Sequence, residues 1–252
     1  MSLVLLADGP ADGVRVLTLN DPDKRNALSP ALQEALTDAI DTVSRDAAAR
    51  VLVVTGAGTA FSAGADLPAL FGRAHATEVG EIRVGLKTIY DSFLRVRRLE
   101  IPVIAAVNGA AVGAGVNLAM CADLRIAGPH AKFGVTFTKL GLHPGGGCTY
   151  FLTQALGGQR ALSLIMDGSV LTADELLHLG LVLEIADDPL AAALETAARW
   201  AEIDPGLARD IKRTVGIAER GNFEEVVDFE SWAQASSARG PQLAEAIARF
   251  TR

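Results

Sequence analysis

IPVIAAVNGAAVGAGVNLAMCA, residues 101–122, is a run of 22 positions without a charged side chain. That length would be enough for a membrane-spanning helix. However, the run is interrupted by proline, glycine and polar residues, namely Pro102, Asn108, Gly109, Gly113, Gly115 and Asn117. No basic flank sets an orientation in a membrane. The pattern instead predicts a buried strand, a glycine-rich turn and the start of a buried helix.

Apolar runs bounded by turn residues predict further strands before and after this stretch. Together with the strand inside it, the predicted strands cover residues 14–19, 51–55, 101–107, 124–127 and 181–185. Ser29-Pro30 predicts the start of an amphipathic helix. The capping box Thr172-Ala-Asp-Glu175 predicts another helix, which Gly180 would end. Because strands alternate with helices, the sequence indicates an α/β core.

The character of the sequence changes at Asp187, after which the chain is rich in Ala with acidic and basic positions on alternating faces. This part predicts four consecutive helices and no strand after Ile185. Its aromatic side chains are Trp200, Phe223, Phe229, Trp232 and Phe250. A helical cluster this small needs a surface on which to bury them. We therefore expect a core of residues 1–190 that holds the ligand site, and a helical region of residues 191–252 that mediates oligomerisation.

Composition narrows the classes of partner. The 252 residues include 23 Lys and Arg against 30 Asp and Glu, a formal charge of −7, which argues against nucleic acid or an anionic membrane. Cys121 and Cys148 form no CxxC motif and have no His at ligand spacing, so we expect neither a disulfide framework nor a metal site. The first residues lack the basic region of a signal peptide, and a cytoplasmic location is expected.

Three glycine-rich turns, residues 56–67, 108–115 and 141–147, are the candidates for chemistry. Glycine allows close backbone approach, and the first N–H groups of a helix have no partner within it. Two such turns that face each other can therefore form an oxyanion hole. The alternative is that each is only a tight strand-to-helix connection. Nucleotide-binding loops fit poorly, because Gly113-x-Gly115 lacks the third glycine of a dinucleotide motif and no turn has the Gly-Lys-Ser/Thr ending of a P-loop.

Six motifs occur along the chain in a fixed order: Asp23-Lys-Arg-Asn-Ala-Leu28, Phe61-Ser-Ala-Gly-Ala-Asp-Leu67, Ile101-Pro-Val-Ile-Ala-Ala-Val-Asn-Gly109, Gly113-Ala-Gly-Val-Asn-Leu-Ala119, Cys121-Ala-Asp-Leu-Arg-Ile-Ala127 and Lys132-Phe-Gly134. In this order and spacing they resemble the crotonase (enoyl-CoA hydratase/isomerase) family over residues 10 to 250. The resemblance implies a spiral of ββα units, a C-terminal helical trimerisation region, and a trimer or a dimer of trimers. It also implies an acyl-CoA substrate, with coenzyme A as part of the substrate and no tightly bound cofactor.

The resemblance assigns roles to individual residues. The backbone N–H groups of Ala63 and Ala114 would form the oxyanion hole for the thioester oxygen. The positions that would contact coenzyme A are Lys24, Arg25, Ala27, Ala63, Asp66, Leu67 and Gly113, and Phe250 would reach the coenzyme A of a neighbouring subunit. Lys24 and Arg25 would supply the local positive charge for the phosphates, although adjacent basic residues on a surface turn also occur without a ligand.

The chain departs from the family at the positions of acid and base. The two glutamates of the hydratases match Asn117 and Phe137, neither of which can transfer a proton at neutral pH. An aspartate that other branches carry a few residues later matches the stretch His143-Pro-Gly-Gly-Gly147, which has no carboxylate. His143 is then the remaining candidate for proton transfer, since imidazole changes charge near neutral pH. It could also be an ordinary loop residue.

Asn117 and Phe137 each have two interpretations. Asn117 could position a water molecule or an acyl substituent, or it could bond a neighbour within its helix. Phe137 and its neighbours could form an apolar acyl pocket or could pack in the core.

Three hypotheses on function follow. The first is an acyl-CoA enzyme that stabilises a thioester enolate and acts by chemistry other than two-glutamate hydration. The second is a non-catalytic protein that binds or carries acyl-CoA with the same fold. The third is a serine hydrolase built on Ser62, for which no partner His lies at a known spacing. Turnover of any thioester distinguishes the first from the second.

Overall fold

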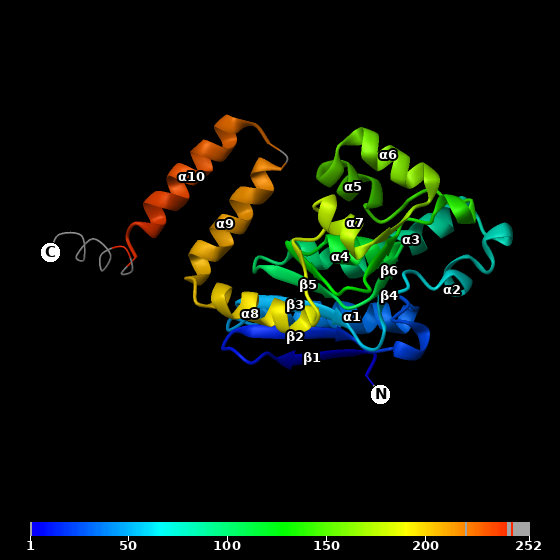
Figure 1. Ribbon diagram of the computed structural model, residues 1–252, viewed down its shortest axis with the longest axis horizontal. Helices are drawn as coiled ribbons and strands as arrows, with labels where there is room; N and C mark the ends of the chain where they lie inside the picture. The colour runs from blue at the N-terminus through cyan, green and yellow to red at the C-terminus, as the bar shows by residue number, and fades with distance from the viewer. Residues whose placement is uncertain (1, 220, 241–242, 244–252) are drawn as a thin grey trace.

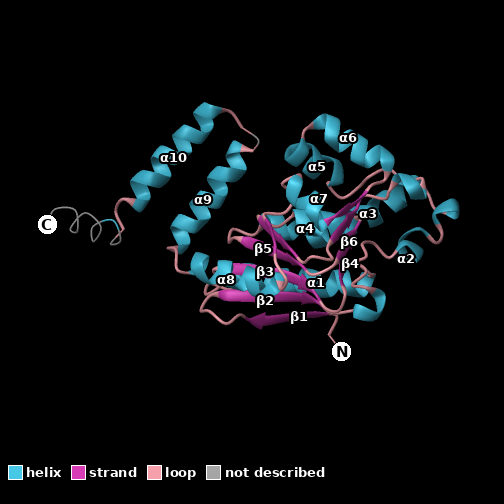
Figure 2. Cartoon of the chain, in the orientation of Figure 1, coloured by secondary structure: helices cyan, strands magenta, loops and turns pink. Residues whose placement is uncertain are grey.

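The computed structural model describes residues 2–219, 221–240 and 243, which form two β-sheets with helices around them (Figures 1 and 2). The strands are β1 (Val4–Asp8), β2 (Val14–Leu19), β3 (Val51–Gly56), β4 (Ala60–Ser62), β5 (Val103–Val107), β6 (Ala110–Val112), β7 (Leu124–Ala127), β8 (Lys132–Gly134), β9 (Val170–Thr172) and β10 (Glu184–Ile185). The helices are α1 (Pro30–Arg45), α2 (Leu67–Phe71), α3 (Val79–Arg98), α4 (Ala114–Met120), α5 (Cys148–Leu156), α6 (Gly158–Asp167), α7 (Ala173–His178), α8 (Pro189–Ala201), α9 (Pro205–Ala218) and α10 (Phe223–Ser237). Short 3₁₀ turns are η1 (Pro22–Lys24), η2 (Ala74–Ala76) and η3 (Thr138–Leu140).

The larger sheet has the strand order β1-β2-β3-β5-β7-β10 and is parallel except for β1. Both of its faces are covered, as a parallel sheet requires. Along β3, Leu52 and Val54 point into a core shared with α1, whereas Val51 and Val53 point toward α8. The strand is therefore apolar at successive positions rather than at alternate ones.

The smaller sheet has the order β4-β6-β8-β9, and β4, β6 and β8 run parallel to one another. Successive strands alternate between the sheets, because β3, β5 and β7 belong to the larger sheet and β4, β6 and β8 to the smaller one. Each pair of strands is followed by helical structure, which gives the spiral of ββα units that the family resemblance implied. The α/β class and the crotonase-type arrangement are thus confirmed.

Several predicted elements are found at their expected places. Ser29 caps α1, with its hydroxyl accepting from the N–H of Leu32, and Thr172 and Glu175 form a reciprocal capping box at α7. The strand predicted at 181–185 is shorter than expected, because the N–H groups of Leu181 and Val182 bond to Leu176 O and so finish the turn after α7.

The uncharged stretch 101–122 folds as β5, a tight turn, β6 and the buried helix α4. Pro102 directly precedes β5. Its carbonyl oxygen accepts a hydrogen bond from the Leu52 N–H of the neighbouring strand β3 at 3.0 Å. No helix within the described ranges has the length and apolar content needed to cross a membrane.

The C-terminal helices divide into two groups, which changes the expected boundary at residue 190. Helix α8 packs on the larger sheet, where Ala193 and Ala197 are fully buried, so it belongs to the core. Helices α9 and α10 pack on each other and extend away from the sheets (Figure 1). The predicted fourth helix and Phe250 lie outside the described residues.

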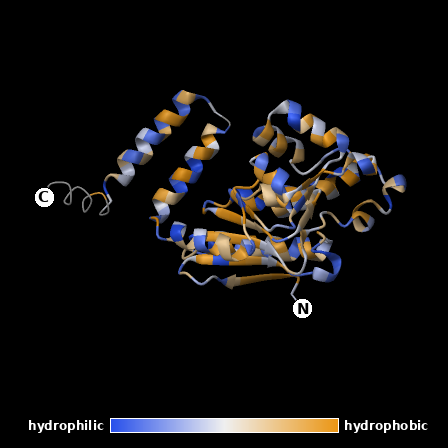
Figure 3. Ribbon diagram, in the orientation of Figure 1, coloured by the Kyte–Doolittle hydropathy of each residue, from blue (hydrophilic) through white to orange (hydrophobic). Residues whose placement is uncertain are grey.

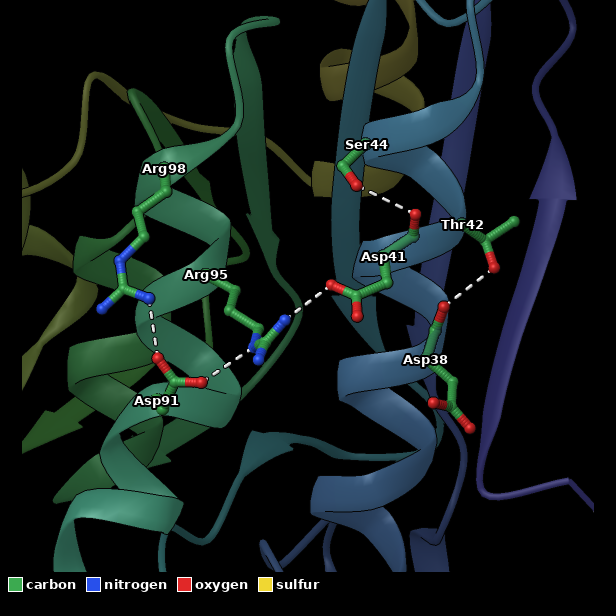
Figure 4. Close-up of polar contacts among 7 residues, drawn as sticks. All are labelled: Asp38, Asp41, Thr42, Ser44, Asp91, Arg95 and Arg98. Carbon is green, nitrogen blue, oxygen red and sulfur yellow. Dashed lines mark hydrogen bonds and ion pairs between the residues drawn. The ribbon is translucent and has the colours of Figure 1, made fainter.

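Helices α1 and α3 pack side by side and share an ion-pair network (Figure 4). Asp91 accepts from Arg95 at 2.9 Å and from Arg98 at 2.7 Å, and Arg95 also reaches Asp41 on α1 at 2.7 Å. These partly exposed pairs contribute little stability individually. They hold the C-terminal half of α3 against α1, and this half carries a side chain of the site described next.

Candidate active site

The first two predicted glycine turns are brought together by the smaller sheet. Strands β4 and β6 are parallel neighbours, with Ala60 opposite Ala110 and Ser62 opposite Ala111. Because parallel strands end at the same edge, the turn that begins at Ala63 lies beside the start of α4 at Ala114. These two glycine-rich segments thus belong to one site and are not separate connections.

Glycine is required where these two backbones touch. Gly64 has φ +86°, and a β-carbon there would overlap the Val112 carbonyl oxygen and lie 3.3 Å from the Ala114 nitrogen. A β-carbon at Gly115 would overlap the carbonyl oxygen of Ser62. The sequence therefore uses glycine for close approach of backbone to backbone, which is the geometry that an oxyanion hole needs.

Hydrogen bonds join the turn at Lys24 to Ala27 to the first glycine-rich turn. Asn26 is fully buried, and its side-chain N–H donates to the carbonyls of Ala57, Ala60 and Phe61 at 3.0, 2.9 and 3.3 Å. The Leu28 N–H donates to Gly64 O at 2.7 Å. The two segments predicted to hold coenzyme A are thus adjacent, with Lys24 and Arg25 exposed at their edge.

A cavity of about 270 Å³ opens beside the two turns. Its walls come from α2, α3, the start of α4 and the segment between β8 and α5, and they are mainly apolar. The larger apolar side chains are Leu67, Leu70, Phe71, Leu86, Ile89, Val112, Phe137, Leu140 and Leu142. The polar side chains are Tyr90, Asn117, Thr136 and His143. Among the described residues that line it, none carries a carboxylate.

The structure corrects the prediction for Ala63. Its N–H donates to Arg25 O at 2.8 Å, so it is already paired and is not available to a thioester oxygen. Ala65 also lines the cavity, and its N–H has no hydrogen-bond acceptor within the described part of the chain. Ala114 is the first residue of α4, where an N–H has no partner inside the helix. Ala65 and Ala114 thus each offer an N–H beside the cavity that no described residue accepts.

Asn117 and Phe137, the positions of the missing glutamates, both line the cavity. The Asn117 amide nitrogen donates to Gly145 O at 2.8 Å, which fixes the orientation of the amide. Its Oδ1 is the one buried side-chain polar atom without a partner in the described ranges. The ring of Phe137 faces Gly113, since a β-carbon on that glycine would lie 3.7 Å from Phe137 Cζ. Neither residue can exchange a proton, so the cavity lacks the two-carboxylate arrangement.

His143 lines the cavity and is exposed. Its Nδ1 lies 2.7 Å from Pro144 O. A carbonyl oxygen only accepts, so Nδ1 carries the hydrogen and the neutral ring keeps a lone pair on Nε2. The neutral imidazole is therefore in the tautomer that can accept a proton on Nε2. Nε2 makes no hydrogen bond to the loop that carries His143.

The remaining candidates have structural roles. Asp66 caps α2 by accepting from the Ala69 N–H at 3.1 Å, and it does not line the cavity. Ser62 is fully buried, with its hydroxyl donating to Asn26 O at 2.8 Å and accepting from Gly64 N–H at 3.2 Å, so it is unsuited to nucleophilic attack. Burial raises the pKa of Cys148 to about 11 and of Cys121 to about 12, which disfavours a thiolate at either position.

Tyr90 and Ala65 are the cavity groups that the sequence did not reveal. Tyr90 is on α3 and belongs to none of the motifs, and the packing of α3 against the segment after β8 brings it here. Ala65 is two residues from Ala63 in Ser-Ala-Gly-Ala, and sequence alone does not tell which of the two N–H groups is paired. Within the described chain, no cluster of His, Cys, Asp and Glu could hold a metal ion.

Comparison with known proteins gives the family of the chain. The family model described as enoyl-CoA hydratase/isomerase matches residues 10–251. The chain is 43% identical over 241 residues to the Mycobacterium tuberculosis protein named "Probable enoyl-CoA hydratase EchA14", with 93% of each chain covered. It is 34% identical to the Escherichia coli 1,2-epoxyphenylacetyl-CoA isomerase, covering 94% of this chain and 92% of the relative. The crystal structure of an enoyl-CoA hydratase from Bacillus anthracis superposes with a TM-score of 0.89 at 31% identity, covering 99% and 96% of the two chains. The chain therefore belongs to the enoyl-CoA hydratase/isomerase family.

Proposed function

We propose that the protein is an enzyme that binds an acyl-CoA, stabilises the enolate of its thioester and moves a proton at the carbon next to the carbonyl. The observation that supports this most is that Ala65 and Ala114, two residues with unpaired backbone N–H groups, line a mainly apolar cavity whose described residues include no carboxylate. Negative charge develops on the thioester oxygen when the α-proton leaves. Preorganised donors aimed at that oxygen stabilise the enolate by about 3 kcal/mol each.

Coenzyme A would lie along the joined turns 24–27 and 63–67. Lys24 and Arg25 are exposed there and can pair with phosphates, which a protein with a formal charge of −7 needs as a local basic site. Gly113 would allow the thioester to approach the start of α4. The acyl chain would then extend between α2 and α3, where the cavity wall is apolar.

His143 is the base in this proposal. Its Nε2 lone pair would accept the α-proton, and the Nδ1–H bond to Pro144 O at 2.7 Å would hold the ring in that tautomer. Proton transfer by one positioned group is enough for α-proton exchange. It does not require the two carboxylates of the hydratases.

We expect replacement of His143 by Gln to slow α-proton exchange of butyryl-CoA in heavy water by about 10²-fold or more, since the base is removed. His178 is a control, because it lies at the end of α7 and does not line the cavity. His178→Gln should leave the exchange rate unchanged. Exchange in His143→Gln at the wild-type rate would exclude His143 as the base.

The reaction is identified by mass spectrometry of saturated, 2-enoyl, 3-enoyl and malonyl-type CoA thioesters incubated with the protein in heavy water. Deuterium entry or bond migration would support enolate chemistry. Gain of water by a 2-enoyl-CoA would instead mean hydration without the two glutamates. No change in any thioester, together with protection of the protein against heating by one of them, would favour a non-catalytic acyl-CoA binding protein.

Self-association as a trimer or a dimer of trimers is part of the same proposal. Helices α9 and α10 expose apolar side chains, among them Phe223 with 75% and Trp232 with 59% of its surface accessible. Figure 3 shows apolar positions along both helices. Exposed apolar area of this kind is typical of subunit contacts.

Light scattering should give a particle mass three or six times the chain mass of 26.3 kDa. The variant Trp232→Asp should lower this particle mass. A wild-type particle with the mass of one chain would contradict the proposal.

A further inference from the structure

Tyr90 is a second proton-carrying side chain in the cavity. It lies on α3 next to Leu86 and Ile89, which also line the cavity, and it is half-buried. Among the described residues of the cavity wall, Tyr90 and His143 are the two with titratable side chains. Of these described side chains, Tyr90 is therefore the one that can act as an acid together with His143.

The hydroxyl of Tyr90 contacts the loop that carries His143. A β-carbon at Gly145 would overlap the Tyr90 oxygen, so the hydroxyl occupies the space that a side chain at position 145 would take. The Gly146 N–H faces the same oxygen. On the other edge of the same peptide group, Gly145 O accepts from Asn117 Nδ2 at 2.8 Å. Tyr90 and Asn117 thus contact one peptide from both sides, and His143 lies two residues before it.

The surroundings of the Tyr90 hydroxyl favour proton donation. The Gly146 N–H faces the Tyr90 oxygen, which leaves the O–H of Tyr90 free to be donated. The same N–H would stabilise the phenolate that remains after donation. Burial raises the pKa of the Tyr90 phenol above its ordinary value, and the Gly146 N–H lowers it by less. The phenol is therefore protonated at neutral pH, which suits an acid rather than a base.

The position of the phenol is also fixed. Asp91, the next residue, pairs with Arg95 and Arg98, and Arg95 reaches Asp41 on α1 (Figure 4). The ring of Tyr90 packs against Phe93, with centroids 6.3 Å apart. A group held by its helix and its neighbours loses little freedom when it acts.

We propose that Tyr90 is the acid that completes bond migration in a 3-enoyl-CoA. This inference rests on the proposed enolate chemistry. His143 Nε2 takes a proton from C2, and the electrons of that C–H bond delocalise into a dienolate whose oxygen is held by Ala65 and Ala114. The Tyr90 O–H then gives its proton to C4, the double bond moves to C2–C3, and the electron pair of the O–H bond remains on the phenolate. A water molecule returns the proton from the His143 imidazolium to Tyr90, so the substrate loses one proton and gains one.

The test follows two events in one reaction of 3-hexenoyl-CoA in heavy water: deuterium entry at C2 and migration of the double bond. Tyr90→Phe keeps the ring and removes the acid. We expect migration to fall by about 10²-fold or more while deuterium entry at C2 stays within a few-fold of wild type. Tyr150→Phe is the matched control, because Tyr150 is the other tyrosine of the chain and lies outside the cavity, and it should change neither event.

The outcomes separate this inference from the proposed function. If Tyr90→Phe lowers the rates of both events equally, the hydroxyl only supports the loop. If it lowers neither rate, Tyr90 takes no part in the reaction. Either result overturns the inference. Wild-type protein that exchanges at C2 without migration overturns it too, but leaves the proposed function intact. Wild-type protein that exchanges nothing overturns both.

A second measurement does not depend on removing the hydroxyl. In the Tyr150→Phe background Tyr90 is the one tyrosine left, so biosynthetic 3-fluorotyrosine labels it alone. Fluorine lowers the pKa of the phenol and retains its hydrogen bonds. In a plot of migration rate against pH, the fall in rate at high pH should then move to lower pH. His143, the other titratable group that faces the cavity, carries no fluorine and is chemically unchanged. A fall in rate that stays at the same pH would overturn the assignment.

Discussion

Replacing the peptide N–H of Ala65 by an ester oxygen, with lactic acid in place of alanine, is expected to slow α-proton exchange of butyryl-CoA by about 10² to 10³-fold. The substitution keeps the methyl side chain and removes one hydrogen-bond donor. Because the Ala65 N–H has no acceptor in the described structure, its loss should cost the folded protein little stability. The effect should therefore appear in the exchange rate and not in the melting temperature.

Replacement of the Ala63 peptide N–H by an ester oxygen is the matched control. That N–H donates to Arg25 O at 2.8 Å, so the ester should cost about 1 kcal/mol of stability. It should leave exchange close to the wild-type rate at a temperature where the variant is folded. A loss of exchange at Ala63 with full activity at Ala65 would contradict the assignment of donors.

Asn26→Ala is expected to destabilise the protein by about 3 kcal/mol or more, because it leaves several buried groups without partners. The side chain is fully buried, donates to three carbonyls and accepts from the Asp21 N–H at 2.9 Å. Its φ of +54° also disfavours alanine. Denaturant unfolding of the variant and the wild type measures the difference.

Two further variants separate these causes. Asn26→Gly accepts the positive φ but restores none of the hydrogen bonds, so most of the loss should remain. Asn20→Ala removes a side chain whose exposed bond to Ser2 O is 2.8 Å, and should change stability by about 0.5 kcal/mol or less. Equal losses at Asn20 and Asn26 would show that the buried network does not join the two turns.

Within the larger sheet the sequence predicted β2, β3, β5 and β7, because these buried strands are long enough to show a pattern, but it did not predict β1. The strands at 14–19 and 124–127 have the predicted bounds, and 51–55 extends by one residue to Gly56. Strands β4, β6, β8 and β9 have three residues each, too few for a periodicity to emerge. Their presence followed from the family resemblance and not from the local pattern.

The site was predictable in its location but not in its donors. The motifs at 61–67 and 113–119 gave both turns of the cavity, and the absence of acids at Asn117 and Phe137 was readable from the chain. Whether Ala63 or Ala65 has the free N–H depends on where the Arg25 carbonyl lies, which is a contact between segments about forty residues apart. Tyr90 likewise enters the site only through helix packing. Long-range contacts of this kind cannot be predicted from a single sequence.

The central claim is that two backbone N–H groups polarise the carbonyl of a bound thioester, and isotope-edited infrared spectroscopy tests it without requiring turnover. Butyryl-CoA labelled with carbon-13 at the thioester carbonyl would be measured free and bound to the wild-type protein. We expect the carbonyl band to shift to lower frequency on binding, and the shift to shrink when Ala65 carries the ester. A bound thioester whose carbonyl band stays at the frequency of free butyryl-CoA would contradict the claim.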